Sequence, residues 1–192
     1  MYQPLFDYIE RYTRQTLTHQ EKEILQSAMQ FKKLRKRQFF LEEGKICQYT
    51  GFILKGATRQ FSVDDNGVDH ILQLCIENWW VVDRQSFIKQ IPSKYFIEAW
   101  DDTELLILPR PNLDVILELP VIKSMFWQMS ENNHIASQKR LDDTLSLNAE
   151  KRYENFQRLY PEIVQRFPQH QIASYLGITK ETLSRIRRRP LG

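Results

Sequence analysis

The middle of the chain, residues 31–108, is a series of short apolar runs separated by turn residues, and this pattern restricts the possible folds most. The runs are residues 39–41, 51–54, 59–63, 70–74, 96–100 and 104–108. Several short strands at this spacing are typical of a β-sandwich or barrel. Asp64-Asp65-Asn66-Gly67 predicts a hairpin between two of them, because Asn-Gly accepts the positive φ of a tight turn.

Helical patterns flank this region. Residues 4–30 indicate helix, with Thr18 and Glu21 spaced as a capping box. A further helix is expected from about Pro120 to Lys139, because apolar residues recur three or four positions apart there. Its stripe consists of Leu119, Ile122, Phe126, Met129, Asn133 and Ala136. That stripe can pack against the chain's own barrel or against a second copy of the chain.

The last part of the chain predicts a second, smaller domain. The polar segment 142–150 is the expected hinge, and residues 151–160 and 161–167 indicate short helices. The expected fold class is therefore α+β, with an N-terminal barrel, a long helix and a small all-α domain.

Charge is distributed unevenly along the 192 residues. Residues 151–192 contain nine Lys and Arg against three Asp and Glu, a net charge of +6, whereas the remainder carries −3. A basic terminal module suits a polyanionic partner such as DNA, because released counterions supply much of the affinity, although basic faces are often only solvated. Cys47 and Cys75 are far apart and fit neither a disulfide framework nor a metal site. With no leader or apolar span in the sequence, a cytoplasmic location without membrane contact is expected.

The strongest motif is residues 169–186, which has the spacing of a helix-turn-helix. Small Ala173 permits a close helix crossing, Gly177 ends the first helix, and Thr179 can cap the second. Leu183 and Ile186 then hold the second helix against the first. The sequence predicts a recognition helix from Thr179 to about Arg189, and a plain helical hairpin is the alternative.

The opposite face of this second helix is polar and basic. It carries Lys180, Glu181, Ser184, Arg185, Arg188 and Arg189. Arginine can bond bidentately to guanine and glutamate can accept from a cytosine amine, each pair discriminating by about 1–3 kcal/mol. The four-residue spacing of Glu181 and Arg185 also permits an ion pair within the helix, which is the simpler interpretation of either residue alone.

The whole chain resembles the Crp/Fnr family of bacterial transcription regulators, on two motifs. They are Gly51-Phe52-Ile53-Leu54-Lys55-Gly56 and Glu181-Thr182-Leu183-Ser184-Arg185. The resemblance implies a cyclic-nucleotide-binding-type jelly-roll sensor barrel over residues 1–119, a dimerisation helix and hinge over 120–147, and a helix-turn-helix domain over 148–192. It also implies a homodimer on an inverted-repeat DNA site, with RNA polymerase as a further partner, and the bases read by Glu181, Ser184 and Arg185, beside which Lys180 is expected to act.

Two features depart from that family. The Gly-Glu pair and Arg-Ser-Ala segment of members that bind cyclic AMP are absent, so cyclic AMP binding is not expected, no cofactor is assigned and the effector is not identified. Trp80, Asp83, Lys94 and Tyr95 are the candidates for an effector pocket, although aromatic clusters usually fill a core. No cysteine or histidine set suggests an iron–sulfur cluster or haem.

The second departure is the β-hairpin wing, for which the sequence after Arg189 leaves no room. Thr179, Arg187, Arg188 and Arg189 are the expected phosphate contacts in its place, and a solvated charge run is the alternative. No catalytic constellation is found, so an enzyme is not expected. The rival to a DNA-binding regulator is a ligand-sensing or protein-interaction module that does not read DNA specifically.

Overall fold

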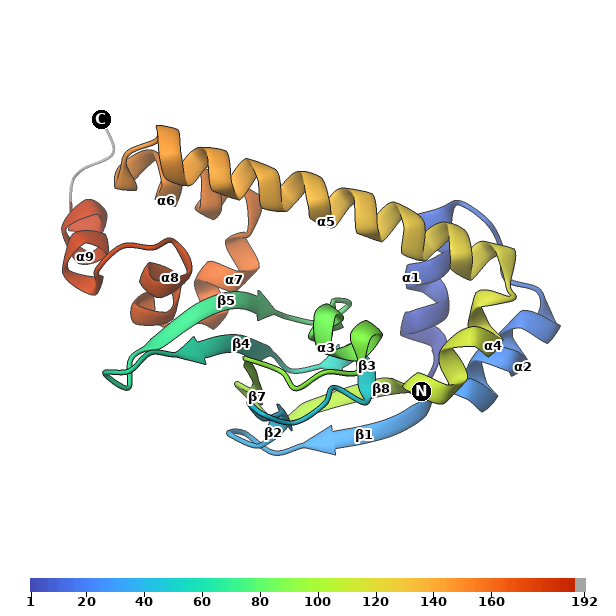
Figure 1. Cartoon of the computed structure of the whole chain (residues 1–192). Coiled ribbons are helices and arrows are strands. Elements are labelled where there is room, and N and C mark those ends of the chain that lie inside the picture. Colours follow the sequence, from blue (N-terminus) through green and yellow to red (C-terminus); the bar gives the residue numbers. More distant parts are fainter. Residues whose placement is uncertain (189–192) are drawn as a thin grey trace. The chain divides into compact units, whose positions relative to one another are not determined.

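A computed structural model describes residues 1–188 and confirms the α+β class (Figure 1). The helices of the N-terminal part are α1 Gln3–Thr13, α2 His19–Ala28, α3 Arg84–Lys89, the 3-10 turn η1 Arg110–Asn112 and α4 Leu113–Leu117. The strands are β1 Gln30–Leu34, β2 Phe39–Leu41, β3 Tyr49–Lys55, β4 Thr58–Val63, β5 Asp69–Cys75, β6 Trp80–Val81, β7 Phe96–Ala99 and β8 Thr103–Pro109. They are followed by α5 Pro120–Ser146, α6 Ala149–Leu159, α7 Pro161–Arg166, α8 Gln169–Tyr175 and α9 Lys180–Arg188.

The strands form two four-stranded sheets with the orders β1-β8-β3-β6 and β2-β7-β4-β5. Each long pairing in the first sheet is antiparallel, with Phe31 opposite Leu106 and Phe52 opposite the same residue on the other side. The predicted hairpin is present: β4 and β5 are joined by a turn in which Gly67 has φ +76°. Strands β1 and β6 were not predicted, because β1 carries Lys32 and Lys33 and β6 has only two residues.

The chain divides into two compact units. The first contains Met1–Gln60 and Cys75–Glu131, and the second contains Phe61–Leu74 with the chain from Asn132 onward. Helix α5 and the β4–β5 hairpin therefore each contribute residues to both units. The predicted domain boundaries at residues 119 and 147 divide the chain differently from these two compact units, and they stay a prediction.

The core of the first unit has two clusters. One lies between the sheets around Ile53, Ile97 and Leu105. The other joins the sheet containing Phe52 to α1, α2 and the beginning of α5, where Ile122 is buried. The predicted apolar stripe is therefore divided. Leu119, Ile122, Phe126 and Met129 pack on the core of the first unit, whereas Asn133 and Ala136 are exposed.

Two helix boundaries differ from expectation. The N-terminal helix is interrupted because Arg14 adopts a left-handed φ of 57° after α1, and α2 begins only at the capping box of Thr18 and Glu21, which is present as predicted. The hinge predicted from residue 142 is wrong up to Ser146, because α5 continues to that residue. Thr144 and Ser146 donate their hydroxyls to carbonyls one turn earlier, so their side chains bond within the helix and do not bond the backbone of a loop.

Candidate DNA interface

Helices α8 and α9 form the helix-turn-helix that the sequence predicts. Gly177 takes φ +65° directly after α8, and the amide of Ile178 donates back to the carbonyl of Ala173 at 3.0 Å. This geometry closes the end of a helix with a left-handed residue, for which glycine has no side-chain penalty. Ile172 and Ala173 are buried, so the small side chain of Ala173 lies where α8 meets its neighbours.

The N-terminus of α9 is fixed by Thr179. Its Oγ accepts a hydrogen bond from the amide of Thr182 at 3.1 Å, which satisfies one of the unpaired donors of the first turn. Leu183 is fully buried and anchors the inner face of α9, which contacts both α8 and α6. Helix α9, the predicted recognition helix, therefore spans Lys180–Arg188 with Thr179 as its cap.

The outer face of α9 is exposed among the described residues. Lys180, Glu181, Arg185 and Arg188 are exposed, and Ser184 is half-buried among them. At about 100° per residue these five positions lie on one side of the helix, opposite Leu183 and Ile186. The structure thus brings the four predicted base readers together with one predicted phosphate contact.

Arg187 is exposed but lies toward α6. Burial raises the pKa of the Tyr153 hydroxyl of that helix, and the nearby positive charge of Arg187 opposes part of the rise. Arg189, also predicted to contact phosphate, lies outside the described residues. The predicted DNA contacts themselves stay a prediction.

Two residues that the sequence did not single out connect α8 to other parts of the second unit. Ser174 Oγ donates to the carbonyl of Asp69 at 3.0 Å and accepts from the amide of Ile71 at 3.0 Å. Strand β5 is at the end of its sheet, so these are bonds to backbone groups that lack a second neighbouring strand.

Arg140 of α5 makes the second connection. Its Nη1 donates to the carbonyl of Leu72 at 2.8 Å and its Nη2 to the carbonyl of Tyr175 at 2.7 Å. The guanidinium also stacks on the Tyr175 ring, 3.9 Å from its centroid. No local sequence signal indicates these contacts, because the partners are 35 to 105 residues apart in the chain.

The predicted effector residues have separate roles in the first unit. Trp80 packs between Phe52 and Phe126, with ring centroids 5.4 and 5.7 Å away. Asp83 is buried and caps α3: its Oδ1 accepts from the amides of Gln85 and Ser86 at 3.1 and 3.3 Å. Its Oδ2 accepts from the hydroxyl of Ser93 at 2.7 Å, so both carboxylate oxygens are engaged.

The remaining two candidates lie beside that network. Lys94 is exposed, and Tyr95 is half-buried with its amide donating to Ser93 Oγ at 3.0 Å. A surface cavity of about 140 Å³ is lined by residues 39–42 and 45–49, and none of the four candidates lines it. The effector pocket therefore stays a prediction.

Known structures share this architecture, although no protein-family model and no curated protein sequence matches the chain. The catabolite activator protein of Thermus thermophilus is 21% identical and superposes with a TM-score of 0.59, covering 92% of this chain and 84% of its own. The c-di-GMP-responsive global regulator CLP of Xanthomonas campestris gives a TM-score of 0.70 at 11% identity, covering 88% of this chain and 89% of its own.

A third neighbour, from Eubacterium rectale, is described as a transcriptional regulator of the Crp/Fnr family. It gives a TM-score of 0.66 at 16% identity, covering 90% of this chain and 82% of its own. The chain has the Crp/Fnr fold. The resemblance that the two sequence motifs suggested is thereby confirmed at the level of architecture. Within residues 1–188 of this Crp/Fnr-type fold, no helix is long and apolar enough to cross a membrane.

Proposed function

We propose that the chain is a sequence-specific DNA-binding transcription regulator that acts as a homodimer on an inverted-repeat site. The observation that carries this proposal is α9: a capped helix with a buried inner face and an outer face of exposed lysine, glutamate and arginines. A helix of this kind enters the major groove with its first residues at the base edges. The basic excess of residues 151–192 supplies the affinity for phosphates.

Residue roles follow from position along α9. Lys180, Glu181, Ser184 and Arg185 lie in its first six residues and are proposed to read bases, with Arg185 bidentate to a guanine. Thr179, at the cap, and Arg188, near the end, are proposed to contact phosphates, as are Arg187 and Arg189. Phosphate contacts fix register and orientation, and base contacts carry the sequence information.

The proposed dimer would explain binding to an inverted repeat, because each copy would bind one half-site. Exposed large apolar residues follow one side of α5, among them Trp127, Leu141 and Leu145. A second copy of α5 would cover them, and a two-fold pair of α9 helices about 34 Å apart would address half-sites one DNA turn apart. Cyclic AMP is not part of the proposal, because the sequence lacks the Gly-Glu pair and the Arg-Ser-Ala segment of members that bind it.

A selection from random DNA duplexes with the full chain tests the proposal. We expect enrichment of an inverted repeat with half-sites one turn apart. Arg185→Ala should relax the preference at one position of each half-site, at a cost of about 1–3 kcal/mol per contact. Arg188→Ala should weaken binding to all sequences alike and lower the salt dependence.

Arg35→Ala is the matched control. Arg35 is an exposed arginine of the first unit, outside residues 151–192, so its removal takes away the same charge without removing a proposed contact. Failure of the wild-type chain to enrich any repeat would refute sequence-specific recognition. An Arg185 variant that weakened every duplex equally would instead assign that residue to the phosphates.

A further inference from the structure

Helix α5 presents a face that is exposed from Trp127 onward. Residues at alternating spacings of three and four lie along it: the half-buried Ser124, followed by the exposed Trp127, Glu131, His134, Gln138, Leu141 and Leu145. Trp127 is 67% exposed and Leu145 79% exposed, whereas Ile122 and Met125 on the other side are buried in the core. This is the heptad spacing by which one helix packs along another.

The occupant that fits this face is a second copy of the same helix. In a parallel two-fold pair each seam residue meets its own counterpart, so Trp127, Leu141 and Leu145 of the two copies cover one another. Glu131 and His134 lie in adjacent layers in the middle. The carboxylates and imidazoles of both copies then lie close together.

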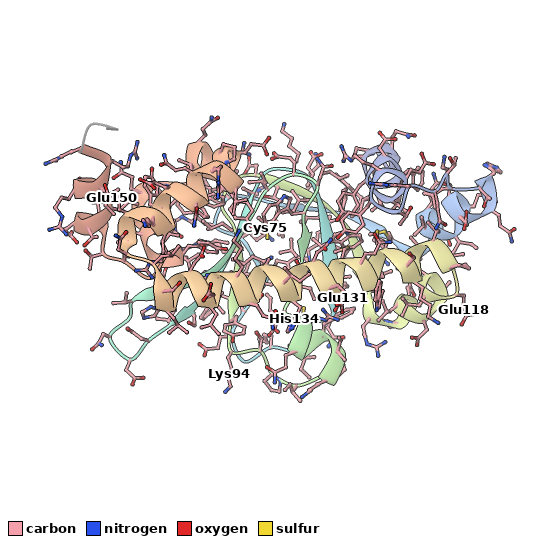
Figure 2. All side chains as sticks on the ribbon, turned by 90° about the horizontal axis from the view of Figure 1, so that it is seen from above. Cys75, Lys94, Glu118, Glu131, His134 and Glu150 are labelled. Carbon is pink, nitrogen blue, oxygen red and sulfur yellow. The ribbon has the colours of Figure 1, made fainter. Side chains whose placement is uncertain are left out.

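Glu131 and His134 are available for a ligand. Figure 2 shows both on α5, one turn apart along the helix. Both side chains are exposed, and neither makes a hydrogen bond or ion pair within the described chain. The segment Glu131-Asn132-Asn133-His134 has the Glu-x-x-His spacing by which helices project a carboxylate and an imidazole from one face into the metal site of a bundle.

We propose that Glu131 and His134 of two copies together bind one divalent transition-metal ion at the centre of the α5 seam. Two carboxylates that face each other and are covered by the partner helix need a compensating cation, because burying unpaired charge is costly. Two imidazole nitrogens and two carboxylate oxygens are a donor set that suits zinc, whereas magnesium and calcium prefer oxygen ligands alone.

A single chain cannot form this site. Residues 1–188 contain no group of three or more His, Cys, Asp or Glu side chains placed to hold a metal. The pair on α5 supplies half of a four-ligand set, and the second copy supplies the other half. The inference therefore depends on the dimer of the proposed function. It adds that metal binding regulates dimerisation, because the metal stabilises the form that has two recognition helices.

The test measures dimerisation of the full chain by sedimentation equilibrium with zinc chloride, with EDTA or with magnesium chloride. Zinc at about 100 times its dissociation constant for the dimer should tighten dimerisation by about 100-fold, and magnesium should leave it as in EDTA. Cobalt(II), used as a spectroscopic probe, should show the visible absorption of a four-coordinate ion at one cobalt for every two chains.

Variants separate this site from other zinc binding. His134→Ala should abolish the zinc effect and the cobalt spectrum. Glu131→Gln should weaken the zinc effect but dimerise more tightly than wild type in EDTA, because it removes two like charges from the seam. His19→Ala is the matched control: His19 pairs with Glu23 one turn away on α2, so this variant removes another exposed histidine–glutamate pair and should keep the full effect.

Three outcomes would overturn the inference. A dimer of equal strength in zinc and EDTA would remove the metal site and leave the dimer. A dimer tightened by acid and not by zinc would assign the pair to a protonated imidazole. A zinc effect that survives in His134→Ala would place the metal elsewhere. A chain that stays monomeric in every buffer and does not bind an inverted repeat would refute the dimer itself, and is distinguishable from the other three.

Discussion

Ser174 offers the sharpest test of how α8 is held in the second unit. Its single hydroxyl makes two hydrogen bonds to β5, to the amide of Ile71 and the carbonyl of Asp69, both at 3.0 Å. A hydrogen bond of this kind contributes about 1 kcal/mol net, so Ser174→Ala should reduce the local stability of this contact by about 2 kcal/mol. At about 1.4 kcal/mol per factor of ten, the opening equilibrium rises about 30-fold.

Native-state hydrogen exchange measures this directly at one atom. The amide of Ile71 is bonded to Ser174 in the wild type and loses this acceptor in Ser174→Ala, so its exchange rate should rise by at least about 30-fold. Amides within β8, which is part of the first unit, should keep their wild-type rates. The measurement thus reports on the contact separately from global unfolding.

Ser137→Ala is the control for the loss of a hydroxyl. Ser137 is exposed on α5, and its side chain makes no hydrogen bond within residues 1–188. Its replacement should leave the Ile71 rate unchanged. If Ser174→Ala changed that rate by less than about threefold, the hydroxyl would not protect the amide, and the argument that β5 is held by α8 would be refuted.

Three further predictions concern the stability of the individual units. Leu183→Ala should lower the unfolding free energy of the helix-turn-helix by about 2–5 kcal/mol, because Leu183 is fully buried. Urea unfolding followed by circular dichroism measures this, and a decrease below about 1 kcal/mol would contradict the prediction. Gly56→Ala should lower the melting temperature more than Gly44→Ala. Both glycines have positive φ, but only at Gly56 would an added Cβ lie 2.6 Å from the carbonyl oxygen of Asp102. Equal melting temperatures of the two variants would contradict this steric clash. Burial raises the pKa of Cys75 to about 12, whereas an unfolded thiol titrates near about 8.5. The folded state thus retains a proton that the unfolded chain loses, so the free energy of unfolding should fall as pH rises above about 8.5, and Cys75→Ala should reduce that fall between pH about 7 and about 9.5.

Local chemistry explains which parts of the fold the sequence could predict. Thr18 with Glu21, Gly67 and Gly177 act on neighbouring residues, so a cap, a hairpin turn and a helix end could be inferred from a few letters. The polar end of α5 could not be inferred in this way. A polar residue such as Thr144 suits a loop as well as a solvent-exposed helix, in which a backbone carbonyl accepts its hydroxyl.

The candidate site shows the same division. The outer face of α9 follows from helical periodicity once Thr179 and Leu183 fix the beginning and the inner side of the helix. The contacts of Ser174 and Arg140 with β5 depend on tertiary structure, which brings together residues that are 68 to 105 positions apart. For Asp83 the sequence suggested a ligand contact, and the fold uses its carboxylate to cap α3 and to bind Ser93.

The position of β5 at the end of its sheet has a consequence for the solubility of shortened chains. An edge strand with free amide and carbonyl groups is a template onto which another polypeptide can add a strand, and natural proteins cover or charge such edges. Ser174 occupies two of these groups, the carbonyl of Asp69 and the amide of Ile71. A chain truncated before α5 lacks α8 and leaves both groups uncovered, and we expect such a fragment to self-associate through β5 even though both of its sheets are intact.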